Sequence, residues 1–417
     1  MSINRRWLII AAVAISFAVK MALAVQTYGT NDALTWEADL EKIRSEGGLT
    51  LYRDGVIPHR GGQQYSNQRF SHPPFMIRLI SAWGWLADVT GFPLRFWIRL
   101  TCGLADVVSV ILLLRILNAL RTSLSLVSVL LVILSPISIL ISGFHVNTDP
   151  IMVSFVLLSI YLVQRGSPVW LAGCAMGMAI NIKIVPILFI PAACMYLRDW
   201  RKALAFSGGI GIVVGMGSIP EVLQDPLTIW NGLSGYSSGL YIWGTSRLSW
   251  ALLPENLYTV YSHSLKTVML AAILGVSVWM NTKKPIPLIL QIAFVSFLFF
   301  SLTPGFAVQY LAWLVPWSVL LGMGQATLFH ALSGAFLFLL YHRASRGLWY
   351  LANTFDTYVW GGLVVYLGLF LWVLICVITL TLLARFRVQQ RLGCAVARQN
   401  ECMQNRKSYE MKEATNR

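Results

Sequence analysis

Charge is what this sequence has least of: 12% of its 417 residues are Asp, Glu, Lys or Arg, whereas 57% are hydrophobic. An ordinary soluble domain carries about 25% charged residues. This deficit, together with a mean hydropathy of +0.66, excludes a water-soluble globular protein. The composition therefore predicts an integral membrane protein that crosses the bilayer many times.

Other familiar patterns are also missing. The six cysteines have no metal-ligand spacing, and four of them fall in apolar runs, so they predict neither a metal site nor a disulfide framework. No Asn-x-Ser/Thr sequon occurs, which favours a bacterial protein over one of the endoplasmic reticulum. No strand pattern and no internal repeat is visible. The net charge of +15 is spread over short loops and a basic tail, which is typical of a topology signal and speaks against nucleic-acid binding.

The apolar runs predict an all-α membrane fold. A spanning helix needs about 20 apolar residues, and fewer where it packs against neighbours. We expect about twelve spans within one polytopic domain (1–391), followed by a basic cytoplasmic tail (392–417). The first run reads as an uncleaved helix and not as a signal peptide. The expected spans are 7–25, 97–117, 124–142, 150–164, 168–182, 185–197, 203–221, 265–281, 286–302, 309–325, 327–341 and 361–384.

The segment Pro73–Val89 decides the topology. It is apolar but contains Arg78 and Asp88, and a span here would move every later loop to the other side. If it lies on the membrane as an amphipathic helix, the basic loops from Arg5 to Arg391 all face the cytoplasm, as the positive-inside rule requires. We therefore expect cytoplasmic termini, a location in the bacterial inner membrane, and a long first extracytoplasmic loop (26–95) with membrane-lying helices.

Two polar clusters face outward in this topology. In the first loop, 31–46 predicts a helix that places Asp32, Trp36 and Asp39 on one face. The second cluster is Gly143–Pro150, between two apolar runs, and it contains His145, Asn147 and Asp149. Hydrocarbon does not accept such groups without partners, so both clusters are expected to line one extracytoplasmic chamber.

In sequence order, these motifs resemble those of the GT-C glycosyltransferases, polytopic enzymes that use lipid-phosphate sugars. The resemblance covers roughly residues 7–320. The motifs are specific for this family because they occur in the same order and on the same side of the membrane. The matching elements are Tyr28–Trp36 with Asp32 in the acidic position, Ser71-His72-Pro73-Pro74-Phe75, Arg99–Asp106, Phe144-His145-Val146-Asn147, the Asn181-Ile-Lys183 turn, and Pro304–Pro316 with Gln309-Tyr310.

The resemblance implies an inverting transfer of a hexose, mannose or glucose, from a polyprenyl-phosphate donor to a lipid, glycan or protein acceptor. Asp32 would be the catalytic base that takes the proton of the acceptor hydroxyl. Lys183 would bind the departing lipid phosphate. No metal-ligand pattern is clear, so we expect no required cofactor, although a divalent ion stays open. The substrate-binding candidates are His72, His145, Asn147, Asp149, Lys183, Arg247, Gln309 and Tyr310.

Each candidate also has a purely structural interpretation. Asp32 could cap its helix, and Asp149 could cap the helix that begins with Pro150. His72 could order its loop, and Asn147 could close a turn. Asp39 reads as an exposed helix charge, and Asp106 is expected to pair with an arginine such as Arg99 or to stay neutral. Arg343 and Arg346 are further outward cations that could contact phosphate or headgroups.

Two other functions compete with an enzyme. A transporter or a flippase for lipid-linked sugars would also have about twelve spans, but transporters place charged groups near the bilayer midplane in repeated halves. Here the polar groups gather at one face and the halves differ. A scaffold protein would leave the outward Asp, His and Lys residues unexplained.

Overall fold

The computed structural model describes most of the chain: residues 3–60, 63–64, 67–120, 125–234, 243–282, 286–345 and 362–388. The predicted basic tail (392–417) lies outside the described residues, as do Arg121, Lys283, Lys284 and Arg346. Within the described ranges the protein is helical, apart from the two-residue strands β1 (His59–Arg60) and β2 (Gln63–Gln64), which pair antiparallel. The prediction of an all-α membrane fold is thus confirmed in outline.

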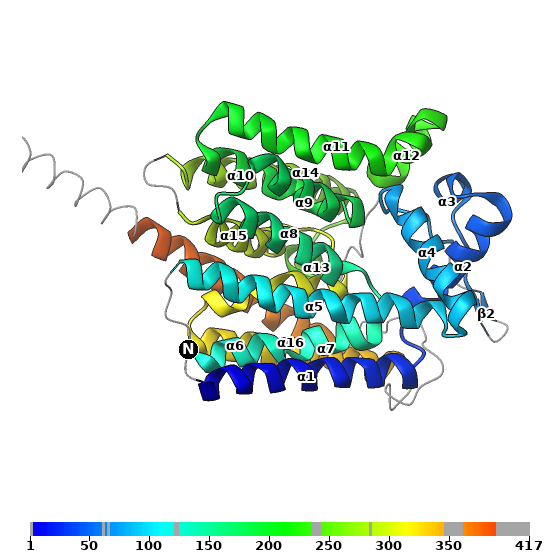
Figure 1. Ribbon diagram of the computed structural model, residues 1–417, viewed down its shortest axis with the longest axis horizontal. Helices are drawn as coiled ribbons and strands as arrows, with labels where there is room; N and C mark the ends of the chain where they lie inside the picture. Colours follow the sequence, from blue (N-terminus) through cyan, green and yellow to red (C-terminus); the bar gives the residue numbers. More distant parts are fainter. Residues whose placement is uncertain are drawn as a thin grey trace, which may run out of the picture.

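Long apolar helices form the body of the molecule and run in a common direction (Figure 1). In the described part of the chain, six helices are long and apolar enough to cross a membrane. Six shorter apolar helices of 10–17 residues pack among them. The expected number of twelve spans therefore stays a prediction. The long helices are α1 (Ile3–Gln26), α5 (Leu94–Ala119), Leu126–His145, α11 (Trp200–Gln224), α16 (Met323–Ala344) and Leu363–Val388.

The shorter helices complete the bundle. Glycines allow one of them, α9 (Val169–Ile182), to approach the long helix α11 closely: a Cβ on Gly173 would lie 2.0 Å from the carbonyl oxygen of Phe206, and one on Gly209 would lie 2.2 Å from that of Trp170. Small residues of this kind allow membrane helices to pack backbone to backbone. The shorter helices are α8 (Asp149–Gln164), α9 (Val169–Ile182), η2 (Val185–Phe189), α10 (Ile190–Leu197), α13 (Gly244–Leu252) and α15 (Leu288–Leu302). They are joined by α14 (Glu255–Trp279), whose apolar part is Ser264–Trp279.

Prolines divide two segments that we expected to be continuous spans. The expected span 309–325 is wrong as a single helix, because it forms two short 3₁₀ helices, η3 (Val308–Leu314) and η4 (Pro316–Leu320). Pro316 has no N–H to continue the helix, and both pieces are buried in the core. The segment before His145 is likewise divided at Pro136 into α6 (Leu126–Ile133), α7 (Pro136–Leu140) and the π-helical η1 (Ile141–His145).

The helices of the first loop gather at one end of the bundle, on the right of Figure 1. They are α2 (Asn31–Glu46), α3 (Leu49–Asp54) and α4 (Phe75–Thr90), beside α12 (Pro226–Ser234). The predicted helix 31–46 is confirmed. In this view α4 runs across the direction of α1 and α5, and Arg78 joins it to the end of α11 through the Gly217 carbonyl and Glu221. We call this end the loop end.

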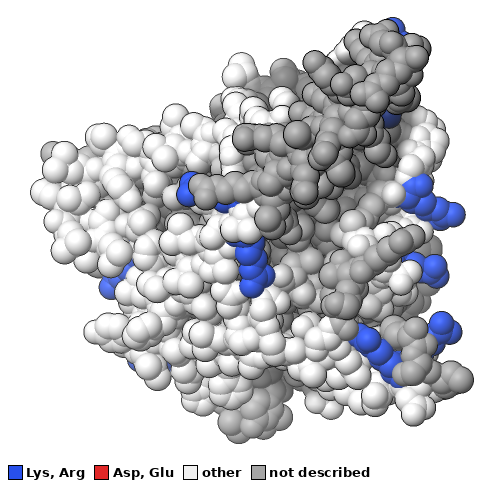
Figure 2. Space-filling model, turned by 90° about the vertical axis from the view of Figure 1, so that its left-hand side faces the viewer, with Lys and Arg blue, Asp and Glu red and all other residues white. Residues whose placement is uncertain are grey.

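The two ends of the molecule differ in charge: acids and bases pair at the loop end, as in Arg44–Asp88 and Arg95–Glu37, whereas mainly basic side chains lie at the opposite end. The acidic side chains of α2, α3 and α4 lie at the loop end, together with those at the end of α11. Because α1 and α11 finish at the loop end, they begin at the opposite one, and the face drawn in Figure 2 shows basic side chains and no acidic ones. The described basic residues at the helix termini of this basic end include Arg5, Arg6, Arg165, Arg198, Arg201 and Lys202.

Candidate active site at the loop end

A cavity of about 170 Å³ lies at the loop end, and we call it the site cavity. One wall is α2, and the others come from the loop before α4, the turn after α9, the start of η3 and the end of α12. It brings together residues that are far apart in the sequence. The predicted site residues that line it are Asp32, His72, Asn147, Lys183, Gln309 and Tyr310.

Asp32 stands in the first turn of α2 and lines the site cavity. The cap of this helix is Thr30, whose hydroxyl accepts a hydrogen bond from the Asp32 N–H at 3.3 Å and donates to the His145 carbonyl at 2.7 Å. The capping alternative for Asp32 is therefore wrong, and its carboxylate is free for other contacts. Asn147 Nδ2 donates to Asp32 Oδ2 at 3.1 Å.

The surroundings of Asp32 keep its carboxylate ionised. Burial acts to raise the pKa of Asp32, but His145, Asn147 and Lys183 together hold that pKa below its usual value of 3.8. His145 Nε2 lies 3.2 Å from Asp32 Oδ2, at ion-pair distance although outside good hydrogen-bond geometry. At neutral pH, Asp32 is thus a charged acceptor facing a cavity.

Backbone carbonyls hold the second polar cluster in place. Four consecutive carbonyls are each bound by a side chain of α5 or of α2 and its cap: Phe144 by Arg99, His145 by Thr30, Val146 by Trp36 and Asn147 by the Cys102 thiol. Val146 has φ +68°, a left-handed conformation that a β-branched residue rarely adopts. Strained backbone of this kind is found where surrounding structure imposes it, often at functional sites. Here it turns His145 and Asn147 toward Asp32.

Arg99 joins the two polar clusters. Its buried guanidinium donates to the carbonyls of Ala24, Thr27 and Tyr28 at the end of α1, and to that of Phe144. The expected pairing of Asp106 with an arginine such as Arg99 is therefore wrong. Gly29, at φ +105°, allows this approach, because a Cβ there would lie 2.2 Å from Arg99 Nη2.

Tyr341 is a residue that the sequence analysis missed. Its hydroxyl lies 2.7 Å from His145 Nδ1, and both side chains are fully buried. If the hydroxyl donates to Nδ1, the ring proton sits on Nε2, the nitrogen that faces Asp32. Only helix packing brings α16 to this turn, since 196 residues separate the pair in sequence. No local pattern could have indicated it.

Lys183 points into the site cavity from the turn after α9. Its Nζ lies 2.5 Å from Asp149 Oδ1, 4.4 Å from the ring centre of Tyr310 and 5.3 Å from that of Trp313. Asp149 is buried behind Lys183 and does not line the cavity, so its predicted contact with substrate is not supported by its position. The capping alternative is also wrong, because Asp149 is the first residue of α8 and not the residue before it.

His72 forms part of the opposite wall. Its ring lies 5.1 Å from Trp36, and its Nδ1 is 3.2 Å from the Ile182 carbonyl. Burial, assisted by the charge of Lys183, lowers the pKa of His72 to about 4. The ring is thus neutral at pH 7, with Nδ1–H donating to the carbonyl, which suits a contact with a sugar hydroxyl better than one with a phosphate.

The remaining predicted residues are placed differently. His145 supports Asp32 from behind and is not a lining residue. Arg247, on α13, and Arg343, exposed at the end of α16, do not line the site cavity either. The prediction that Asp39 is an exposed helix charge is wrong. Its side chain is buried, with 3% exposure, and it lines the site cavity.

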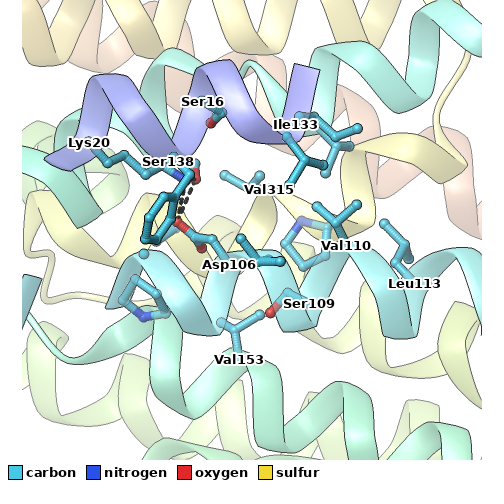
Figure 3. Close-up of a pocket in the computed structure, with 18 residues that line it drawn as sticks. Ser16, Lys20, Asp106, Ser109, Val110, Leu113, Ile133, Ser138, Val153 and Val315 are labelled. Atoms are coloured by element: carbon cyan, nitrogen blue, oxygen red, sulfur yellow. Dashed lines mark hydrogen bonds and ion pairs between the residues drawn. The ribbon is translucent and has the colours of Figure 1, made fainter. Parts of the chain in front are cut away.

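A second cavity of about 40 Å³ lies deeper in the bundle (Figure 3). Lys20 of α1 pairs with Asp106 of α5 at 2.6 Å, and the Ser138 and Ser142 hydroxyls also bind this carboxylate. Asp106 thus takes a lysine as its partner. This network ties α1 and α7 to α5 through groups that hydrocarbon would otherwise reject.

Across the part of the chain that the structure describes, no group of three or more His, Cys, Asp or Glu side chains is arranged to hold a metal ion. The expectation that no divalent ion is required stays a prediction. Comparison with known proteins yields one family match: the profile described as glycosyltransferase family 87 matches residues 70–303, more than half of the chain. No curated protein matches.

Proposed function

Because the chain belongs to glycosyltransferase family 87, we propose that the site cavity moves a hexose, mannose or glucose, from a polyprenyl-phosphate donor to an acceptor hydroxyl. Family membership makes the protein a membrane glycosyltransferase and disfavours a transporter, a flippase or a scaffold. One observation supports the proposed chemistry: an ionised carboxylate, Asp32, and a cation, Lys183, line the same cavity at the loop end.

Asp32 acts as the general base in this proposal. Its carboxylate accepts the proton of the acceptor hydroxyl while the acceptor oxygen bonds to the anomeric carbon. The contacts from Asn147 and His145 orient the carboxylate, and its low pKa keeps it ionised. One base and a phosphate leaving group allow a single displacement, so the anomeric configuration inverts.

Lys183 stabilises the leaving group. As the bond from the anomeric carbon to the phosphate oxygen breaks, the electron pair remains on the lipid phosphate, whose charge a nearby cation stabilises. Asp149, Tyr310 and Trp313 hold the ammonium in position. Gln309 and the neutral ring of His72 are then placed to contact sugar hydroxyls.

The distribution of charge supports the proposed orientation. Lys and Arg are favoured on the cytoplasmic side of short loops. The basic end would therefore face the cytoplasm, with the N-terminus, and the loop end would face outward. Since nucleotide-activated sugars are not available outside a bacterial cell, the donor is expected to be attached to lipid. A glycolipid, a glycan or a protein is the acceptor.

A radiolabel assay tests the function directly. Membranes from cells that express the protein are incubated with polyprenyl-phosphate [¹⁴C]mannose or [¹⁴C]glucose, and label is measured in the acceptor fraction. Asp32→Asn preserves the shape of the side chain but removes the base, so transfer is expected to fall by at least about 100-fold. The product is expected to have the inverted anomeric configuration.

The matched control is Asp88→Asn, which alters an exposed carboxylate at the same end of the molecule. This variant is expected to transfer sugar at the wild-type rate. Full activity in Asp32→Asn at equal expression would exclude Asp32 as the base, and a product of retained configuration would point to a covalent intermediate.

A further inference from the structure

Asp39 is a buried carboxyl group that has no role in the proposed reaction. It is 3% exposed, yet it lines the site cavity. Within the described residues, neither a side chain nor a backbone group donates a hydrogen bond to it. Burial raises the pKa of Asp39 to about 8. Buried polar groups are almost always hydrogen-bonded, and because Asp39 lines the site cavity, a molecule bound there can supply its hydrogen-bond partners.

The site cavity has two chemically distinct ends along α2. Seven residues separate Asp32 from Asp39, which corresponds to about 10 Å along a helix. The first end, which we call the catalytic end, contains Asp32, Asn147 and Lys183, which supply the base, its hydrogen-bond partner and the phosphate-binding cation of the proposed reaction. The second end, which we call the outer subsite, contains Asp39 together with Gln68, Arg69 and Phe70.

The outer subsite has the side chains that suit an uncharged sugar. The Phe70 and Trp36 rings are apolar platforms that contribute to the cavity wall. A neutral carboxyl both donates and accepts hydrogen bonds, and a guanidinium donates them, which matches the mixed donors and acceptors of vicinal hydroxyls. Gln68 and Arg69 are exposed, so this end opens to solvent, and a bulky acceptor can enter there.

We infer that the outer subsite binds the sugar of a glycosylated acceptor through Asp39 and Arg69, and so holds a neutral hexopyranoside next to the catalytic end. This inference rests on the proposed function, because the donor phosphate at Lys183 places the anomeric carbon close to Asp32. Asp39, two helical turns away along α2, is then expected to contact the acceptor. The acceptor class is thereby a glycolipid or glycan that ends in a hexose.

Ligand binding is measured without catalysis. The full chain is purified in lipid nanodiscs, and saturation-transfer NMR follows the binding of methyl α-mannopyranoside and methyl α-glucopyranoside. Wild-type protein is expected to bind at least one of them. Asp39→Leu is expected to weaken binding about tenfold, the effect of removing a buried hydrogen-bonding group. Asp39→Asn, which keeps polar atoms, is expected to weaken binding less.

Glu41→Leu is the matched control, since Glu41 is an exposed acid on the same helix and is expected to leave binding unchanged. Carbodiimide labelling gives a second measurement: dicyclohexylcarbodiimide attacks protonated carboxyls, and the bound glycoside is expected to slow modification of Asp39 in wild-type protein. Absence of binding to both glycosides, or equal binding by wild type and Asp39→Leu, would overturn the inference.

The outcomes for the subsite and for the reaction are separable. Asp32→Asn is expected to bind the glycoside like wild type while transferring no sugar. If Asp32→Asn still transfers sugar, Asp32 is not the base, but the binding of the glycoside at the outer subsite is unaffected by that result. If Asp32→Asn loses transfer while substitutions of Asp39 do not change glycoside binding, the role of Asp32 as base is supported and the outer subsite is refuted.

Discussion

The side chains around Asp32 decide what this carboxylate can do. An aspartate at the start of an exposed helix would be an ordinary acid, but here Asn147 donates to it and His145 lies beside it. Tyr341 in turn contacts His145 from behind, as a positioning residue that does not touch substrate. Groups behind a reactive side chain fix its tautomer and orientation.

Tyr341→Phe tests this support. The variant keeps the ring but leaves His145 Nδ1 without the hydroxyl, so the imidazole no longer holds one tautomer toward Asp32. Sugar transfer is expected to fall by about 10- to 100-fold. The acidic limb of the pH–rate profile is expected to move to higher pH, because His145 lowers the pKa of Asp32 less effectively. Rates are measured in the membrane assay across pH.

Tyr366→Phe, in an exposed tyrosine of the last helix, is the control and is expected to keep the wild-type rate and profile. A merely structural role for Tyr341 would lower the rate without moving the acidic limb. That result would contradict the proposed support of Asp32.

Asp39 makes stability depend on pH. Its pKa is raised from 3.8 to about 8, so the folded state binds the proton more tightly than the unfolded chain does. The stabilisation is complete below about pH 4 and is lost as pH rises toward 8, by several kcal/mol in total. Asp39→Asn is expected to unfold with a flatter pH dependence between 5 and 8 than wild type, as measured by thermal melting. Identical slopes would contradict this assignment, and Glu41→Gln is the exposed control.

At the scale of elements, a few polar contacts position the helices around the site. Arg99 binds the carbonyls at the end of α1 and in the turn before α8. Prolines divide the Leu126–His145 segment and the η3–η4 segment into short helical pieces. Irregular backbone at membrane depth is tolerated where protein buries it. These broken segments supply His145, Gln309 and Tyr310, and Asn147 follows the first of them by two residues.

The Lys20–Asp106 pair is the clearest test of an element contact. Lys20→Met removes the cation and leaves the half-buried Asp106 with only hydroxyl partners, so the variant is expected to lose about 3 kcal/mol of stability, the lower end of the range for a buried pair. The double variant Lys20→Met/Asp106→Leu replaces both charges by apolar side chains and is expected to recover most of that loss. Melting temperatures in detergent measure both effects. A double variant as unstable as the single one would show that the pair is not an isolated ion pair.

At the scale of the whole molecule, the two ends of the helical bundle differ in the side chains that they expose and in the presence of the site cavity. The site cavity and most of the described acidic side chains lie at the loop end, where basic partners such as Arg44 and Arg95 accompany them, whereas the charged side chains described on the face shown in Figure 2 are all basic. α8 connects the two: it begins at Asp149, behind the cavity, and Arg165 caps its other end about 24 Å away at 1.5 Å per residue. Position along this axis therefore predicts the side of the membrane.

Cysteine labelling checks this axis. In a background without the native cysteines, Glu41→Cys at the loop end and Arg165→Cys at the basic end are treated with a membrane-impermeant maleimide. In whole cells, Glu41→Cys is expected to react and Arg165→Cys to react only after the membrane is opened. Labelling of both positions from the same side would refute the proposed topology.

Local features of the sequence determined the class of protein and several of its parts. Low charge and long apolar runs are sufficient for a helical membrane protein, and the i, i+4, i+7 spacing of Asp32, Trp36 and Asp39 placed the helix at 31–46 correctly. The order of polar motifs also led to a glycosyltransferase, and the family match agrees. These features depend on composition and on neighbours in the chain, so they can be read without a fold.

Only the tertiary structure decided which polar groups meet. The Lys20–Asp106 pair, the burial of Asp39 and the contact of Tyr341 with His145 each depend on which helices become neighbours. The same holds for Asp149, which reads as a helix cap in sequence and proves to be the partner of Lys183. An ion pair or a buried carboxyl is stabilised by atoms that surround it in space, and in a helical bundle those atoms come from segments far apart in the chain.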